Sequence, residues 1–120
     1  MTNRIDKPHT VLHEGQIEIV QTDTFRDWLD ALRDRKARAR IVDRLSRLAN
    51  GNAGDTKSVG AGVQELRLQF GPGYRIYYTW RAGVLVVLLI GGDKDSQKRD
   101  IALAKRMVEE AADGLEGFPL

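Results

Sequence analysis

The segment ELRLQFGPGYRIYYTW, from Glu65 to Trp80, constrains the fold more than any other part of the chain. Polar and apolar residues alternate along both of its halves, and Gly71-Pro72-Gly73 separates the halves. Alternation with a period of two predicts a half-buried strand, and glycine and proline between two such stretches predict a turn. The segment therefore predicts a β-hairpin with one face on a core.

The alternation assigns the side chains of this hairpin to two faces of a sheet. The face expected toward the core contains Leu66, Leu68, Phe70, Ile76, Tyr78 and Trp80. The face expected to point outward contains Glu65, Arg67, Gln69, Arg75, Tyr77 and Thr79.

The outward face carries the first indication of chemistry. Pairing of the two strands across the turn puts Arg67 beside Arg75. Two guanidiniums on rigid strands, with the hydroxyl of Tyr77 alongside, suit a phosphate group. The structural alternative is that both arginines pair with Glu65 across the strands.

Two further strands and a loop are predicted outside the hairpin. Residues 16–22 alternate and predict the first strand of the chain. Residues 84–90 (VLVVLLI) are continuously apolar, as expected for a strand that is buried on both faces. Residues 53–62 are rich in glycine and predict a loop that leads into the hairpin.

Three other segments show apolar residues at helical spacing. We expect Thr24 and Asp27 to form a capping box that opens one helix, and we expect a second helix to run from Lys36 to Ala49. We expect a last helix to be capped by Asp95 or Ser96. The order β-α-α-β-β-β-α predicts an α+β fold with about four mainly antiparallel strands, two N-terminal helices packed on the sheet and a C-terminal helix.

The composition narrows the class of protein. With 120 residues, the chain predicts one domain over residues 16–112, a flexible N-terminal arm at residues 1–15 and a C-terminal tail at residues 113–120. There is no cysteine, and both histidines, His9 and His13, lie in the arm, so we expect no disulfide, thiolate chemistry or metal site. No signal peptide or membrane-spanning apolar run is visible, and we expect a cytoplasmic protein.

Basic residues crowd one short part of the chain, although the net charge is only +2. They are Arg33, Arg35, Lys36, Arg38, Arg40, Arg44 and Arg47. A solvated helix surface is the simpler interpretation, and contact with RNA or with an acidic partner is the alternative.

Four segments in a fixed order carry a family resemblance. They are FRDWLDAL (25–32), ARARIVDRL (37–45), ELR with GPGYRIYY (65–67 and 71–78) and GGDKDSQ (91–97). Together they resemble the RelE/ParE toxin superfamily, and most closely its HigB-like branch, the addiction-module killer proteins of phage Gp49 type. The resemblance covers residues 17–112.

This resemblance implies a microbial-RNase-like sheet and metal-independent, cofactor-independent cleavage of messenger RNA, usually on the ribosome. It also implies neutralisation by a cognate helix-turn-helix antitoxin of the HigA type. Contact with DNA would then be indirect, through the antitoxin, and no membrane is involved.

The resemblance also transfers site residues. The basic strand residues of the family correspond to Arg67 and Arg75, which would compensate the charge that develops on phosphorus. The cation after the buried strand corresponds to Lys94, near the N-terminus of the last helix, where anions are favoured. Lys57 in the glycine-rich segment is a weaker correspondence. The structural alternative is that Lys94 is an ordinary surface lysine in a turn.

One part of the family pattern is missing. Several relatives have a catalytic tyrosine or histidine near the start of the last helix, and residues 97–101 contain neither. The general acid and base are therefore unassigned, with Lys94 and Glu65 as candidates. Tyr77 is expected to orient a phosphate or to stack on a base.

The leading hypothesis is a toxin of a type II toxin–antitoxin pair that inhibits translation as an mRNA endoribonuclease. One alternative is a ParE-like inhibitor that binds DNA gyrase without catalysing a reaction, because one fold can serve several functions. Another is a degenerate toxin that acts only as a co-repressor with its antitoxin.

Overall fold

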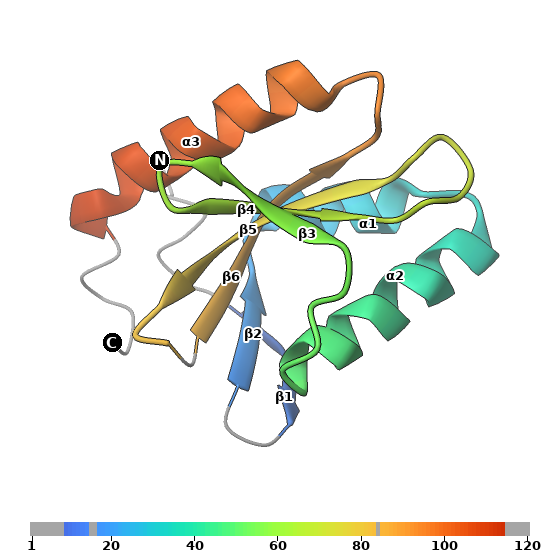
Figure 1. Cartoon of the computed structure of the whole chain (residues 1–120), viewed down its shortest axis with the longest axis horizontal. Coiled ribbons are helices and arrows are strands. Elements are labelled where there is room, and N and C mark those ends of the chain that lie inside the picture. Colours follow the sequence, from blue (N-terminus) through green and yellow to red (C-terminus); the bar gives the residue numbers. More distant parts are fainter. Residues whose placement is uncertain (1–8, 15–16, 84, 115–120) are drawn as a thin grey trace.

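The computed structural model describes residues 9–14, 17–83 and 85–114, and the side chains of residues 17–83 and 85–111. This part of the chain forms three helices and a six-stranded sheet. In chain order the elements are β1 (His9–Glu14), β2 (Ile17–Gln21), α1 (Asp23–Ala31), α2 (Arg35–Ala49), β3 (Thr56–Gly60), β4 (Val63–Arg67), β5 (Arg75–Arg81), β6 (Leu85–Gly92) and α3 (Gln97–Gly114) (Figure 1).

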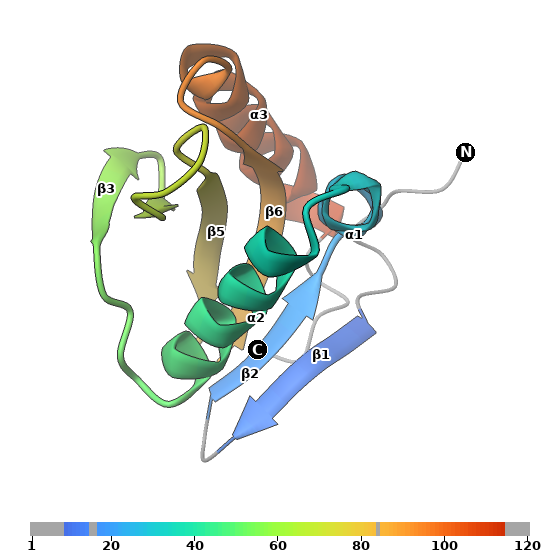
Figure 2. The ribbon, with the colours of Figure 1, turned by 90° about the vertical axis from the view of Figure 1, so that its right-hand side faces the viewer.

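The strands follow the order β1-β2-β6-β5-β4-β3 across the sheet. The pair β2–β6 is parallel and the other four pairs are antiparallel. The predicted α+β fold with a mainly antiparallel sheet is confirmed, but the sheet has two strands more than expected. Figure 2 shows that the additional strands, β1 and β3, lie at the two edges of the sheet.

Both additional strands lie where the sequence lacks an alternating pattern. Residues 9–14 form β1 and not part of a flexible arm, and residues 56–60 form β3 and not a loop. In β1 the register shifts between Thr10 and Leu12, and in β3 it shifts between Ser58 and Gly60. Such bulges interrupt the period of two, so these strands cannot be recognised from alternation. Residues 1–8 and 15, the rest of the expected arm, and residues 115–120, most of the expected tail, lie outside the described residues.

Helices cover both faces of the sheet. Helices α1 and α2 pack on one face and α3 packs on the other, and Figure 1 shows α2 and α3 on opposite sides of the sheet. In β6, Val86 and Leu88 face the α1/α2 side, whereas Val87 and Leu89 face the α3 side. This arrangement explains the continuously apolar sequence of β6, a strand buried on both faces as predicted.

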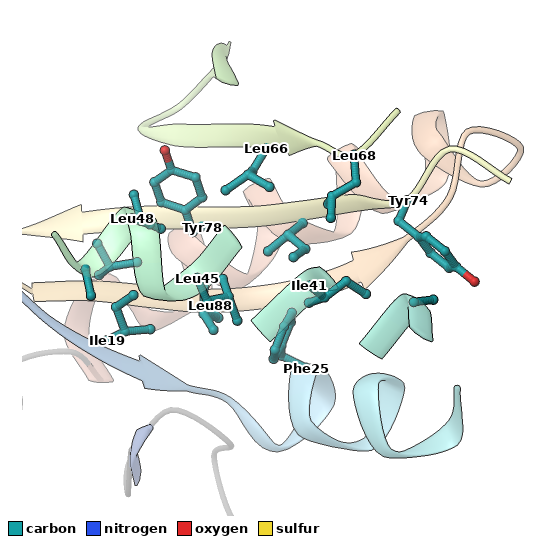
Figure 3. Close-up of a cluster of buried hydrophobic side chains, with 14 residues drawn as sticks. Ile19, Phe25, Ile41, Leu45, Leu48, Leu66, Leu68, Tyr74, Tyr78 and Leu88 are labelled. Carbon is teal, nitrogen blue, oxygen red and sulfur yellow. The ribbon is translucent and has the colours of Figure 1, made fainter. Parts of the chain in front are cut away.

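The hairpin has the predicted register, with Leu66 opposite Ile76 and Arg67 opposite Arg75. The predicted apolar face lies in the α1/α2 core, where Leu66, Leu68, Ile76 and Tyr78 are buried beside Ile19, Phe25, Ile41 and Leu88 (Figure 3). Phe70 and Trp80 are partly buried against the same core.

The opposite face of the hairpin is not outward, because α3 covers much of it. Glu65 and Tyr77 are completely buried, and Arg75 and Thr79 are also buried. Alternation shows which side chains share a face, but it does not show whether a distant helix covers that face. The expectation of a solvated polar face is therefore wrong for these four residues.

Helix α1 starts two residues earlier than expected, because Thr22 and not Thr24 forms its N-cap. The Thr22 hydroxyl accepts a hydrogen bond from the backbone N–H of Phe25 (3.0 Å) and donates one to the carbonyl of Leu89 (2.7 Å). The first bond satisfies a free N–H of the helix, and the second ties the helix to β6. None of the described helices combines the length and apolar character needed to cross a membrane.

The double role of Thr22 generates a prediction about stability. Thr22→Val keeps the shape of the side chain but leaves two buried polar groups without their partner, and should lower the free energy of unfolding by about 1–3 kcal/mol. Urea unfolding followed by circular dichroism measures the change. Thr24→Ala, at the position first expected to be the cap, should change it by less than about 0.5 kcal/mol. Equal losses in the two variants would contradict the assignment of the cap.

Candidate functional site

A row of directly paired residues crosses the sheet at the end of β4. Arg67 in β4 pairs with Arg75 in β5, and Arg75 pairs with Gly92 in β6. Directly opposed residues of antiparallel strands project to the same face. Both arginines therefore belong to the α3 face, and the predicted pairing between them is confirmed.

The turn of the hairpin brings Lys94 to the same place. A Cβ built on Gly73 would lie 3.2 Å from the Cβ of Lys94 and 3.5 Å from Nη1 of Arg75. The backbone N–H of Lys94 also donates to the carbonyl of Pro72 (3.4 Å). With φ of +79°, Gly73 adopts a conformation that suits glycine, so this turn allows Lys94 and Arg75 to approach one another. The side chain of Lys94 is exposed.

Arg75 is the least ordinary charged residue of the row. Arg75 is only 7% exposed, and its Nη1 donates to the carbonyls of Gly73 (3.0 Å) and Tyr74 (3.2 Å). Its Nε is buried without a hydrogen-bond partner. Within the described part of the chain, no carboxylate forms an ion pair with it. A buried cation without a carboxylate is unfavourable, and an anion bound from solution would relieve this.

Arg67 is held by a residue that the sequence analysis did not select. Its Nη2 lies 3.1 Å from Oδ1 of Asp55, and Gln69 donates to Oδ2 of the same carboxylate (2.8 Å). The hydrogen bond from Gln69, followed by the charge of Arg67, lowers the pKa of Asp55 below its usual value. The alternative in which both arginines pair with Glu65 is therefore wrong. Prediction of β3 would have revealed Asp55, because the backbone N–H of Arg67 donates to its carbonyl.

Glu65 forms a buried hydrogen-bonded group with Tyr77 and Gln97. The Tyr77 hydroxyl and the Gln97 amide both donate to Oε2 of Glu65, at 3.0 Å and 2.7 Å. The other oxygen, Oε1, is buried and has no hydrogen-bond partner. Because Tyr77 is completely buried, its ring is not available to stack on a base in this conformation. Gln97, the first residue of α3, ends the GGDKDSQ segment of the family pattern, but the sequence analysis did not select it as a site residue.

The last helix is fixed by a second buried carboxylate, that of Asp100. The Ser96 hydroxyl donates to Oδ2 of Asp100 (2.5 Å), and the backbone N–H of Asp100 donates to the carbonyl of Ser96 (2.9 Å). A Cβ on Gly92 would overlap this carboxylate, so only glycine fits at the end of β6. These contacts fix the start of α3 against β6 and so determine where Lys94 and Gln97 lie.

Lys57 lies on the same face, at the edge of the sheet. It is exposed in β3 and pairs with Glu65, which in turn pairs with Tyr77. This row is two residues along β4 from the Arg67 row, or about 7 Å at about 3.4 Å per residue. The arrangement therefore offers a nearly buried guanidinium, a second arginine and two exposed lysines to an anionic ligand. Among the described side chains, no group of three His, Cys, Asp or Glu residues could hold a metal ion.

Comparison with known proteins gives one family and one relative. The family model described as "Phage derived protein Gp49-like (DUF891)" matches residues 27–109. A protein from Haemophilus influenzae, described as "Uncharacterized protein", is 49% identical over 94 residues, which is 78% of this chain and 95% of the relative. No solved structure matches the chain.

The buried hydroxyl of Tyr77 generates a prediction about pH. Burial, followed by the negative charge of Glu65, raises the pKa of Tyr77 well above its usual value of 10.0. The hydroxyl therefore loses its proton more readily in the unfolded chain, and stability that is complete below pH 10.0 is lost as the pH rises further.

Urea unfolding between pH 8 and pH 11 should show this loss, and Tyr77→Phe should reduce its slope above a pH of about 10. The variant also lacks the hydrogen bond to Glu65, so its stability should already be lower at pH 8. Parallel declines of the original chain and the variant would show that Tyr77 does not cause the loss.

Proposed function

Because the chain belongs to the Gp49-like family of phage-derived proteins, a family of the RelE/HigB toxin type, we propose that it is a HigB-like toxin that cleaves messenger RNA. The observation that carries the proposal is the nearly buried guanidinium of Arg75, which has no carboxylate partner among the described residues. A phosphodiester supplies the negative charge that this guanidinium lacks. Membership of the family implies an antitoxin as partner.

The proposed reaction is attack of a ribose 2′-hydroxyl on the adjacent phosphorus. A bond forms between the 2′-oxygen and phosphorus, and the bond from phosphorus to the 5′-oxygen breaks. The 2′-hydroxyl loses one proton and the 5′-oxygen gains one, which leaves a 2′,3′-cyclic phosphate and a 5′-hydroxyl. No metal or cofactor is required, because the nucleophile is internal and the charge on the phosphate can be compensated by arginine.

The three cations would share this chemistry. Arg75 and Arg67 stabilise the negative charge that develops on the phosphate oxygens, and Asp55 keeps Arg67 in place. Lys94 is exposed beside Arg75 and is the group that we assign to the leaving 5′-oxygen. Lys57 binds the RNA backbone farther along the same face.

We assign Glu65 and Tyr77 to positioning. Both are completely buried, and their hydrogen bonds hold Gln97 at the start of α3. Glu65 would act as a base only if Gln97 moved away from it.

The partners follow from this reaction. The substrate is messenger RNA, cleaved on the translating ribosome, which places the protein in the cytoplasm. The antitoxin is of the helix-turn-helix, HigA-like kind, and it inhibits by covering the basic residues of the site. DNA is contacted only through the antitoxin.

Removal of the Arg75 guanidinium is the central test. Arg75→Gln should slow cleavage about 100- to 1000-fold, as expected when a group that stabilises the charge of the transition state is lost. The rate is measured by mapping new 5′-hydroxyl ends on a message during translation in a purified system. Thermal unfolding of the variant establishes that the fold is retained.

Arg26→Gln is the matched control, because it removes an arginine from α1, which packs on the other face of the sheet. It should cleave at the original rate. Equal rates for Arg75→Gln and the control would remove Arg75 from the mechanism. Inhibition of DNA gyrase without cleavage of RNA would instead favour the ParE-like function.

A further inference from the structure

A groove lies between α2 and the residues that follow β4, on the side of the sheet away from α3. In Figure 1 the loop between β4 and β5 extends toward the same side of the molecule as the start of α2. The groove has a volume of about 270 Å³ and is lined by Arg40, Asp43, Arg44, Arg47, Leu68, Gln69 and Phe70.

Two of the three arginines in this groove are occupied by the protein itself. Arg44 donates to the carbonyls of Arg67 (2.8 Å) and Ala53 (3.0 Å), and Arg47 forms an ion pair with Asp43 (3.1 Å). These contacts fix the two walls, because they tie α2 to the end of β4 and stiffen the surface of the helix.

Arg40 is the arginine left for a ligand. It is exposed, and within the described residues it forms no ion pair. Its guanidinium carbon lies 4.7 Å from the centre of the Phe70 ring. Phe70 is itself supported by the ring of Tyr74, at a centroid distance of 5.6 Å. The groove therefore contains a planar cation that lies over an aromatic ring and has no carboxylate partner among the described residues.

This pair of groups favours a nucleobase. Proteins that bind single-stranded RNA stack the bases on aromatic rings and on arginine guanidinium planes, and a cation compensates the adjacent phosphate. A volume of about 270 Å³ has room for one base and its sugar. An acidic peptide would need several free cations, and here Asp43 and the backbone carbonyls already engage Arg47 and Arg44.

The groove is also connected to the candidate site. Gln69 lines the groove, and its amide donates to the carboxylate of Asp55 that holds Arg67. The pairing between β3 and β4 ends next to Asp55, whose backbone carbonyl accepts a hydrogen bond from the backbone N–H of Arg67. Gln69 and Asp55 therefore link the groove to the arginine of the candidate site.

We propose that the groove is a second RNA subsite, which holds a nucleotide flanking the cleaved phosphodiester with its base against Arg40 and Phe70. The subsite rests on the proposed function, because it binds another part of the same strand. This second subsite contributes binding affinity, whereas Arg67 and Arg75 act on the phosphodiester that is cleaved.

Binding of 2′-O-methyl oligoribonucleotides tests the subsite without cleavage. Fluorescence anisotropy with the full chain measures the Kd of a labelled trinucleotide and of a labelled nonanucleotide. Phe70→Leu removes the aromatic ring but keeps an apolar side chain, and Arg40→Gln removes the cation. Each should raise the Kd of the nonanucleotide about 5- to 100-fold, since a base stacked on a protein side chain contributes about 1–3 kcal/mol. The Kd of the trinucleotide should change less than about twofold.

Arg35→Gln is the matched control, because it removes an exposed arginine of α2 that does not line the groove. It should leave the Kd of the nonanucleotide within about twofold. An equal loss in Arg35→Gln and Arg40→Gln would show nonspecific attraction to a basic helix and would overturn the proposal. If Phe70→Leu does not fold, Arg40→Gln, an exposed position, decides the question.

Two other outcomes also decide it. Unchanged oligonucleotide binding in both groove variants, with weaker binding of a labelled decaglutamate peptide, would make the groove a protein-docking site and would overturn the proposal. If the variants weaken oligonucleotide binding but the original chain cleaves no message, the subsite is supported and the nuclease function fails. Arg75→Gln should retain the difference between groove variants and control.

Discussion

The register between β4 and β5 is the constraint on which the rest of the structure depends. Because side chains alternate along a strand, a shift of one strand by one residue would turn its side chains over, and Arg67 and Arg75 would no longer share the α3 face. The same shift would move Leu66 of β4 or Ile76 of β5 out of the core, where both are completely buried. The burial of apolar side chains on one face therefore determines the position of the cations on the other.

The two faces of the sheet bury different kinds of side chain. The α1/α2 face is apolar, and burial there supplies a large part of the driving force for folding. The α3 face contains two buried carboxylates and one nearly buried guanidinium, which are unfavourable unless they are hydrogen-bonded or paired. Glu65 and Asp100 accept hydrogen bonds from Tyr77 and Ser96, whereas Arg75 donates only to backbone carbonyls. Arg75, with its buried Nε unpaired, lies at the candidate site.

The sequence predicts those features that depend on local pattern. The hairpin, its register and the strand buried on both faces follow from alternation and from a continuous apolar stretch. The edge strands do not follow from it, because bulges break their alternation. Asp55 and Gln97 were missed for a related reason: each acts on a residue more than ten positions away, Arg67 or Glu65, and only the pairing of β3 and the path of α3 bring them together. Arg67, Arg75 and Lys94 were recognisable because a family pattern accompanies them.

Asp55, which directly precedes β3, contacts residues that belong to both sides of the sheet. Asp55 accepts from Arg67, which belongs to the α3 face, and from Gln69, which lines the groove beside α2. Arg44 reaches the carbonyl of Arg67 from the other side, so a residue of α2 supports the strand that carries the site. A ligand at either side would therefore act on the same short segment of backbone. Since this segment is held by charged hydrogen bonds as well as by the buried side chain of Leu68, its geometry depends in part on polar contacts that a polyanion can complement or disturb.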